Sequence, residues 1–422
     1  MAPNAYIRKG SQHLRKKQVD VSLTLAKHLL LNNGKDSNLV FSPISIQVVL
    51  SLLAAGSSGE TLEQLLTFLK AKSIDDLNTV YAHLVDVVFA DGSSSGGPIV
   101  SVANGVWLDE ALTFKNSYQH VAETTYKAAS HRVDFKNKAE EVRNLVNLWA
   151  EKETHDLVKE ILPAGSVDRS TKLILANALY FKGVWSRPFN ASHTKHFAFH
   201  LLDDDSSSIQ VPFMTSREMQ YISVFEGFKV LKLSYKQGLA PPYEQGLKLP
   251  HKRGHPKNDQ DEKHSFSMFI ILPDAKDGLP ALIEKAESKP GFLDRHYPRE
   301  KVKVGEFRIP KFKFEYAIEA SEALKSLGLV FPFDQDVGLR EMVSDPMPLF
   351  VSKIFHKSLI EVDEQGTEAA AATSASLGLG CGRPRPVETV DFVADHPFLF
   401  IIRENTTGIV QFMGHVLNPS KT

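Results

Sequence analysis

The stretch DEQGTEAAAATSASLGLGCGRPRPVETV, from Asp363 to Val390, guides the interpretation of the whole chain. Small residues dominate it, and no large aromatic side chain occurs before Phe392. A segment with so little apolar surface cannot hold itself in a core, so it predicts a long exposed loop. The stretch also alternates like a strand, so that one face could be buried while the other meets water. The face that could be buried comprises Thr367, Ala369, Ala371, Thr373, Ala375, Leu377 and Leu379.

Two other interpretations of this stretch are open from its residues alone. It could be a flexible linker, or a helix, because alanine favours helices. Gly366 stands at its start, where a freely rotating backbone would allow the chain to hinge. The sequences on either side of the stretch favour the loop that can become a strand.

Motifs along nearly the whole chain resemble those of the serpin family, and of its plant branch in particular. EQGTEAAAAT (364–373) is followed, after a variable segment, by FVADHPFLFIIRENTTGIVQFMGHVLNP (392–419). Both look like the reactive-centre loop and C-terminal strands of a serpin. Five further segments occur in the family's order: NLVFSPISIQVVLSLLAAGSSGET (38–61), LILANALYFKGVW (173–185), VPFM (211–214), FSMFIILPD (266–274) and IPKFKFEY (309–316).

Periodicity along the chain predicts an α+β fold. Helices are predicted mainly in the first half, at 19–31, 44–55, 61–68, 75–89 and 139–153, with a later one at 318–327. Strands are predicted at 38–41, 99–108, 173–181, 208–213, 220–224, 229–235, 266–272, 301–309, 312–316, 398–402 and 408–416. No linker separates the halves, so residues 1–422 are expected to form a single domain. The resemblance implies three β-sheets, about nine helices and an exposed reactive-centre loop at 364–390.

Residues 237–264 are longer than the loop expected at this place in a serpin. The segment contains four prolines and is very polar at its end, so we interpret it as a disordered surface insertion. His251, Lys252, Arg253 and His255 could form a small polyanion or metal site. Acidic residues nearby dilute this charge, which favours a solvated loop.

Composition excludes several classes of protein. The formal net charge is −1, so neither nucleic-acid nor membrane binding is expected. No run of 18 apolar residues could span a membrane. Cys381 is the only cysteine, which excludes an intramolecular disulfide and fits a reducing compartment. The N-terminus has no apolar stretch typical of a signal peptide. We therefore expect a cytoplasmic monomer, with a signal-less route out of the cell as the alternative.

Enzyme motifs are absent from the sequence. It contains no GxSxG, HExxH or CxxC motif, and its histidines lack the spacing of metal ligands. A hydrolase is therefore a distant alternative, and no metal or other cofactor is expected. His356 and His396 are interpreted as structural histidines. The resemblance adds a minor alternative, because histidines at matching places in serpins have been linked to pH-sensitive loop insertion.

The resemblance implies a suicide-substrate inhibitor of proteases. The target attacks the loop and forms an acyl-enzyme, and the loop then inserts into the central sheet and traps it. A non-inhibitory binding, storage or chaperone protein is the alternative. Bulky, charged or proline residues in the hinge would favour that alternative, and this hinge has an uninterrupted inhibitory pattern. The hinge consists of Glu364, Gln365, Gly366, Thr367, Glu368, Ala369, Ala370, Ala371 and Ala372.

The family's register places the reactive bond between Gly380 and Cys381, because Gly380 is the seventeenth residue counted from Glu364. Prolines follow Arg383 and Arg385, which argues against a trypsin-like target. The expected targets are serine endopeptidases with a small primary pocket and papain-like cysteine endopeptidases. The residues expected to set this specificity are Leu377, Leu379 and Arg383.

Overall fold

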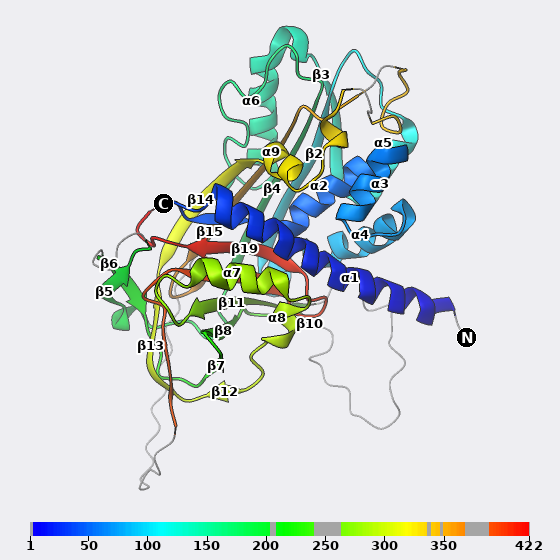
Figure 1. Ribbon diagram of the computed structural model, residues 1–422. Helices are drawn as coiled ribbons and strands as arrows, with labels where there is room; N and C mark the ends of the chain where they lie inside the picture. Colours follow the sequence, from blue (N-terminus) through cyan, green and yellow to red (C-terminus); the bar gives the residue numbers. More distant parts are fainter. Residues whose placement is uncertain are drawn as a thin grey trace.

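The computed structural model describes residues 3–202, 208–239, 263–335, 339–346, 349–367 and 388–421 (Figure 1). Nine α-helices lie in these residues: α1 (Pro3–His28), α2 (Pro43–Ala55), α3 (Gly59–Phe68), α4 (Ile74–Val88), α5 (Asn116–Thr125), α6 (Phe135–Glu153), α7 (Leu279–Ser288), α8 (Phe292–Arg295) and α9 (Ser321–Ser326). A π-helical turn, η1 (Leu29–Asn33), follows α1, and three short 3-10 helices are η2 (Ser93–Ser95), η3 (Ala191–His193) and η4 (Phe331–Phe333).

Three sheets form the β-structure of the described residues, together with one short strand pair. The central sheet has the order β14 (Phe312–Glu319), β15 (Lys353–Val362), β4 (Leu173–Val184), β2 (Ile99–Asp109) and β3 (Ala128–Val133), with β16 (Gly366–Thr367) added on β4. The seven-stranded sheet has the order β1 (Leu39–Phe41), β19 (Val410–Val416), β18 (Phe398–Glu404), β11 (Phe266–Pro273), β8 (Phe228–Ser234), β7 (Gln220–Phe225) and β12 (Lys301–Val302). The four-stranded sheet has the order β17 (Val390–Val393), β13 (Val304–Pro310), β6 (Ser208–Met214) and β5 (Lys195–His200).

The layers meet around α1, which crosses the middle of the molecule in Figure 1. The central sheet lies above it in that view, with α6 beside it, and the seven-stranded sheet lies below with α7 and α8. One large apolar cluster joins α1, α2 and α4 to both of these sheets. A second cluster packs the seven-stranded sheet against the four-stranded sheet, and a third lies between α6 and the central sheet.

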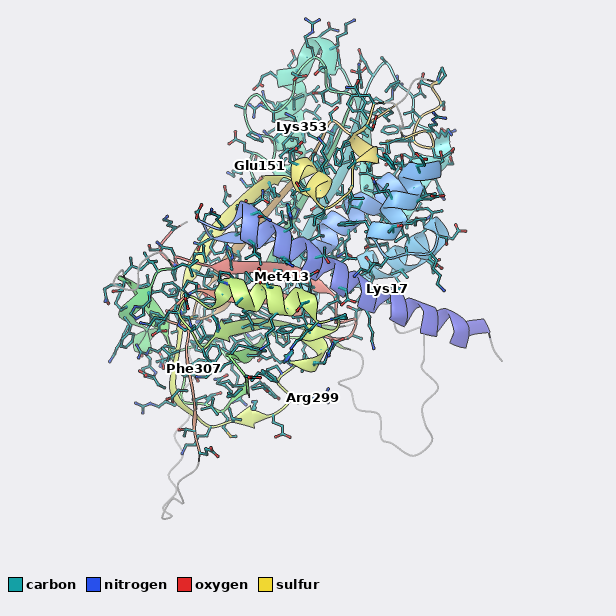
Figure 2. The ribbon with its side chains drawn as sticks, in the orientation of Figure 1. Lys17, Glu151, Arg299, Phe307, Lys353 and Met413 are labelled. Atoms are coloured by element: carbon teal, nitrogen blue, oxygen red, sulfur yellow. The ribbon has the colours of Figure 1, made fainter. Side chains whose placement is uncertain are left out.

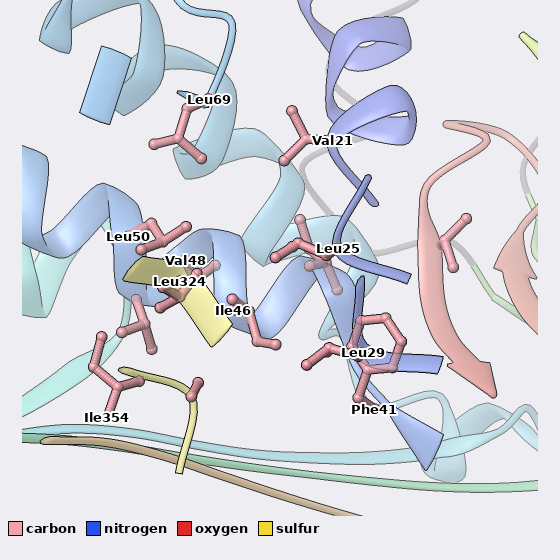
Figure 3. Close-up of a cluster of buried hydrophobic side chains, with 14 of the residues drawn as sticks. Val21, Leu25, Leu29, Phe41, Ile46, Val48, Leu50, Leu69, Leu324 and Ile354 are labelled. Atoms are coloured by element: carbon pink, nitrogen blue, oxygen red, sulfur yellow. The ribbon is translucent and has the colours of Figure 1, made fainter. Parts of the chain in front are cut away.

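Helix α2 is the buried centre of the larger cluster (Figure 3). The Ser42 hydroxyl caps it by accepting a hydrogen bond from the Ser45 amide at 3.3 Å, and Pro43 occupies its first turn. Residues 43–54 are all buried, as expected for a helix with apolar side chains on every side. Leu50 is fully buried there, beside Val48 and Ile46.

The α+β class and most of the predicted elements are confirmed. The structure also contains elements that were not predicted, among them α5, α7, α8, β3, β5 and β17, and α1 begins at Pro3, well before the helix predicted at 19–31. Two further differences have a clear physical reason. The helix predicted at 318–327 begins later, because β14 continues to Glu319 and α9 occupies Ser321–Ser326. Strand β15 was not predicted, because its polar residues, such as His356 and Lys357, interrupt the apolar pattern. Both residues are nevertheless buried. Tertiary contacts therefore override local pattern in this strand.

The ends of the segment interpreted as an insertion form a strand pair. Strand β9 (Gly238–Leu239) pairs with β10 (Lys263–His264) in antiparallel register. Residues 240–262, including His251, Lys252, Arg253 and His255, lie outside the described residues. No helix in the described part of the chain is long and apolar enough to cross a membrane.

Truncating the centre of α2 should destabilise the protein strongly. We expect Leu50→Ala to lower the free energy of unfolding by roughly 2–5 kcal/mol, because it opens a cavity in a fully buried site. The matched control is Leu148→Ala on α6, where the side chain is 66% exposed and the change should be within about 0.5 kcal/mol. Urea unfolding of both variants tests this difference, and equal losses would contradict the packing described for α2.

Candidate functional site

The central sheet is only partly closed between β4 and β15. These two parallel strands are paired from Lys353–Ile174 to Ser358–Leu179. Within the described residues they make no further pairs, although β15 continues to Val362 and β4 to Val184. The unpaired interval therefore comprises residues 359–362 of β15 and 180–184 of β4. Strand β16 pairs with β4 at the far end of this interval, in antiparallel register. The sheet therefore has room for one more strand at its centre, and β16 already occupies the first position.

A tight turn brings the chain from β15 into β16. The carboxylate of Asp363 accepts hydrogen bonds from the amides of Gln365 and Gly366, at 2.8 and 3.1 Å. Its own amide donates to the Gly366 carbonyl at 2.9 Å. A Cβ atom on Gly366 would collide with the Gly183 carbonyl oxygen, so this position requires glycine. The sequence predicted a hinge at Gly366. In the structure, the backbone of Gly183 lies close to Gly366.

Two stacked aromatic rings hold the start of the loop. Trp185 and Tyr235 stack with centroids 4.5 Å apart and an interplanar angle of 18°. The indole of Trp185 donates to the Asp363 carbonyl at 2.9 Å. The hydroxyls of Tyr235 and Thr367 share a hydrogen bond of 2.8 Å, and Thr367 is only 2% exposed. Burial holds the pKa of Tyr235 well above its usual value, so the phenol stays neutral.

Glu364 connects three parts of the structure at the same end of the sheet. One carboxylate oxygen accepts a hydrogen bond from Lys311 Nζ and the other accepts one from the Thr194 hydroxyl, each at 2.7 Å. Its backbone carbonyl accepts from the Phe189 amide at 2.7 Å. Burial alone would raise the pKa of this carboxyl, but the hydrogen bonds from Lys311 and Thr194 outweigh it and lower the pKa. Glu364 is therefore an ionised anchor for the turn.

A buried polar row crosses the sheet where β4 and β15 are still paired. The Ser42 amide donates to Nε2 of His356 at 2.9 Å, so that nitrogen carries no proton. Nδ1 lies 2.8 Å from the Asn177 side-chain oxygen and donates to it. Asn177 in turn donates to the Asn104 side chain on β2. Burial lowers the pKa of His356 to about 3, so the ring is neutral at physiological pH.

A strap of chain, residues 155–166, crosses the α6 face of this same pair of strands. Its carbonyls at Lys159 and Ser166 accept hydrogen bonds from Lys357 and Lys353 of β15, at 2.9 and 2.7 Å. On the opposite side, His155 Nδ1 lies 3.1 Å from the hydroxyl of Ser101 on β2. The strap therefore crosses over β4, with contacts to β15 on one side and to β2 on the other. Lys353 and Glu151 are labelled near this region in Figure 2.

Sequence reasoning located only some of these residues. Trp185 was quoted only as the last residue of the motif at 173–185; it is buried, and its indole also holds the turn at Asp363. Lys311 was not singled out, because no local pattern connects it with Glu364, 53 positions away. Among the described residues no group of three or more metal-ligating side chains lies together.

The remaining predicted site residues lie outside the described part of the chain. The predicted reactive bond and the residues expected to set its specificity all fall in 368–387, as does the rest of the hinge. They are Glu368, Ala369, Ala370, Ala371, Ala372, Leu377, Leu379, Gly380, Cys381 and Arg383. The described part of the site is thus the opening of the sheet and the first turn of the loop.

Comparisons with known proteins agree with this geometry. The family model "Serpin (serine protease inhibitor)" matches residues 16–419. Serpin-ZX of Arabidopsis thaliana is 50% identical over 405 residues, which cover 95% of this chain and 97% of the relative. Serpin-ZXA of Oryza sativa subsp. japonica is 49% identical over 389 residues, covering 92% of this chain and 91% of the relative.

Solved structures give the same result. The structure of Arabidopsis AtSerpin1 in its native stressed conformation is similar with a TM-score of 0.85 and 48% identity, covering 97% of this chain and 99% of that one. The chain belongs to the serpin family, whose members include serine protease inhibitors. Its curated relatives place it in the plant serpin-Z branch of that family.

The neutral state of His356 predicts a pH dependence of stability. Its folded pKa of about 3 lies below the unfolded value of 6.5, so the unfolded chain binds the extra proton in between. This contribution is present in full above pH 6.5 and is lost as the pH falls. We expect His356 to account for roughly 1.5 kcal/mol of lost stability between pH 6.5 and 5.

Urea unfolding at several pH values, for the wild type and His356→Gln, measures this contribution. His415 has a pKa lowered to about 4 by burial and should act in the same direction in both proteins. The difference between the two proteins therefore isolates His356. Identical pH dependences would show that His356 is not held neutral in the folded state.

Proposed function

We propose that this serpin is a suicide-substrate inhibitor of serine and papain-like cysteine endopeptidases. The observation that carries the proposal is the half-open central sheet, with β16 already paired at the edge of the interval between β4 and β15. A loop whose first residues are in place as a strand can complete that strand once the loop is cut. The proposal treats residues 1–422 as one cytoplasmic, monomeric unit and needs no cofactor.

The inhibitory reaction would begin as ordinary proteolysis. The nucleophile of the target attacks the carbonyl carbon of Gly380, and the bond to Cys381 breaks as the new N-terminus leaves with a proton. The acyl-enzyme remains attached to the loop arm. The arm then inserts between β4 and β15 and carries the protease with it. Fourteen residues, 367–380, extend over roughly 46 Å, which is enough to reach the other end of the sheet.

The described residues have separate roles in this mechanism. Asp363, Gly366 and Thr367 direct the arm toward the opening, and Trp185 and Tyr235 hold that turn in place. His356 and Asn177 join the strands that the arm must separate, so their hydrogen bond must break as the arm passes. The strap tied to Lys353 and Lys357 crosses the same pair of strands and must shift as well.

A charged hinge should convert the inhibitor into a substrate. Thr367→Arg would place a guanidinium where the Thr367 side chain is buried beside Tyr235, at a high desolvation cost. Insertion would slow, and deacylation of the protease would finish first. On SDS gels we expect cleaved inhibitor and no covalent complex. A variant that trapped protease as well as the wild type would contradict the proposed insertion.

The control for this variant is Thr389→Arg. It adds the same charge in exposed chain on the other side of the loop, which does not insert. It should therefore keep the covalent complex. Loss of the complex in both variants would point to impaired protease binding rather than impaired insertion.

The reactive bond can be identified directly by mass spectrometry of the released C-terminal fragment. After incubation with a panel of serine and cysteine endopeptidases, we expect a fragment that begins at Cys381 and a covalent complex with the same enzyme. A fragment that begins elsewhere in 375–386 would correct the bond but keep the mechanism. Cleavage by every enzyme without any complex would favour a non-inhibitory serpin.

A further inference from the structure

A row of cations and aromatic rings lies at the open edge of the seven-stranded sheet. In the register of the sheet, Lys301 of β12 is opposite Tyr221 of β7, and Tyr221 is opposite Lys232 of β8. Lys232 is in turn opposite Phe269 of β11. Residues opposite one another on adjacent strands share a face of the sheet, so these side chains form one line.

The cations and rings alternate along this line. The Nζ atoms of Lys301 and Lys232 each lie 5.2 Å from the centroid of the Tyr221 ring. Lys232 Nζ also lies 4.7 Å from the centroid of Tyr297, and the Arg403 guanidinium lies 6.0 Å from the same ring. Tyrosine rings attract cations through the negative face of the ring, which explains the alternation. We call these five residues the cation row.

Among the described residues, carboxylate partners lie only at the inner end of the cation row. Arg403 is buried and donates to Asp294 as well as to the Gly408 carbonyl. Within the described residues, Lys232 and Lys301 form no ion pair with a carboxylate. Their two ammonium groups lie no more than about 10 Å apart, because both lie 5.2 Å from one centroid. In the part of the chain that the structure describes, the outer end of the row therefore carries two positive charges that lie against aromatic rings.

The sequence around the row adds to its positive charge. Arg299 and Lys303 lie next to β12 and are exposed, and Glu300 is the acidic residue between Arg299 and Lys301. Figure 2 shows Arg299 at the lower edge of the molecule, and Met413, in the buried part of the same sheet, near its middle. The charged end of the sheet thus faces solvent, while its other end is packed under helices.

We propose that the cation row binds a linear phosphoanion, with phosphate groups bridging Lys232 and Lys301. Lysine ammonium groups bind phosphate as point charges, and a chain of phosphates presents negative charge at each unit along a line. The tyrosine rings keep the two ammonium groups in place before the anion arrives, which reduces the ordering cost of binding. This site uses none of the residues of the β4–β15 opening, so it is independent of the proposed inhibition.

Isothermal titration of the full-length protein with sodium tripolyphosphate, beside orthophosphate, tests the proposal. We expect saturable binding of tripolyphosphate that is tighter than that of orthophosphate and weakens with added sodium chloride. Lys301→Gln should weaken tripolyphosphate binding roughly tenfold, because it removes one charge-assisted contact. Lys301→Arg should restore most of it.

The matched control is Lys152→Gln, which changes the net charge of the protein equally at an exposed position on α6. It should leave binding unchanged. Equal weakening by Lys152→Gln and Lys301→Gln would show attraction by overall charge and overturn the proposal. Equal affinity for the two phosphates would also overturn it, as would tighter binding of a glutamate hexapeptide than of tripolyphosphate. Absence of tripolyphosphate binding would also overturn the proposal, and Lys301 would then be a charge that protects an edge strand from pairing.

Discussion

The structure depends on one backbone constraint, which is that β4 and β15 are paired over only part of their length. Strands at the centre of a sheet normally satisfy their backbone groups on both sides, because unpaired buried groups are costly. Here the turn at Asp363 and the buried contacts of Glu364 and Thr367 hold a short third strand at the end of the unpaired interval. The strap on the α6 face lies over the part of β4 and β15 that is still paired, because it is hydrogen-bonded to Lys353 and Lys357.

Much of the fold could be predicted from local pattern. The residues of α2 and β4 are sufficient to predict these elements. Helix α2 has an apolar run that begins after Ser42 and Pro43, and β4 is an almost continuous apolar run. Strand β15 could not be predicted in this way, because His356 and Lys357 are buried by partners far away in sequence. Polar residues of this kind are expected to be exposed when only the sequence is considered. In the fold they are buried because His356 contacts the Asn177 side chain and Lys357 contacts the Lys159 carbonyl.

The site divides in the same way. Gly366 and Thr367 could be identified from the small-residue pattern and the family's motif, and the structure gives each a physical reason in the Gly183 carbonyl and the Tyr235 hydroxyl. Lys311 and the hydrogen bond of Trp185 could not be found, because they depend on distant segments meeting at one end of the sheet. A sequence pattern predicts the local conformation of a segment, but it does not predict which distant residues the segment contacts.

The direction of β16 has a consequence for the kind of ladder at the centre of the sheet. β15 runs parallel to β4, and β16 runs antiparallel to β4 and hence to both. A strand completed between them would exchange one ladder of slanted hydrogen bonds for two ladders of perpendicular ones, which are slightly more stable per residue. The uncut chain thus keeps the less favourable strand direction at its centre. Under the proposed mechanism, the strand directions alone, before any side chain is considered, would give the cut molecule a more stable hydrogen-bond geometry.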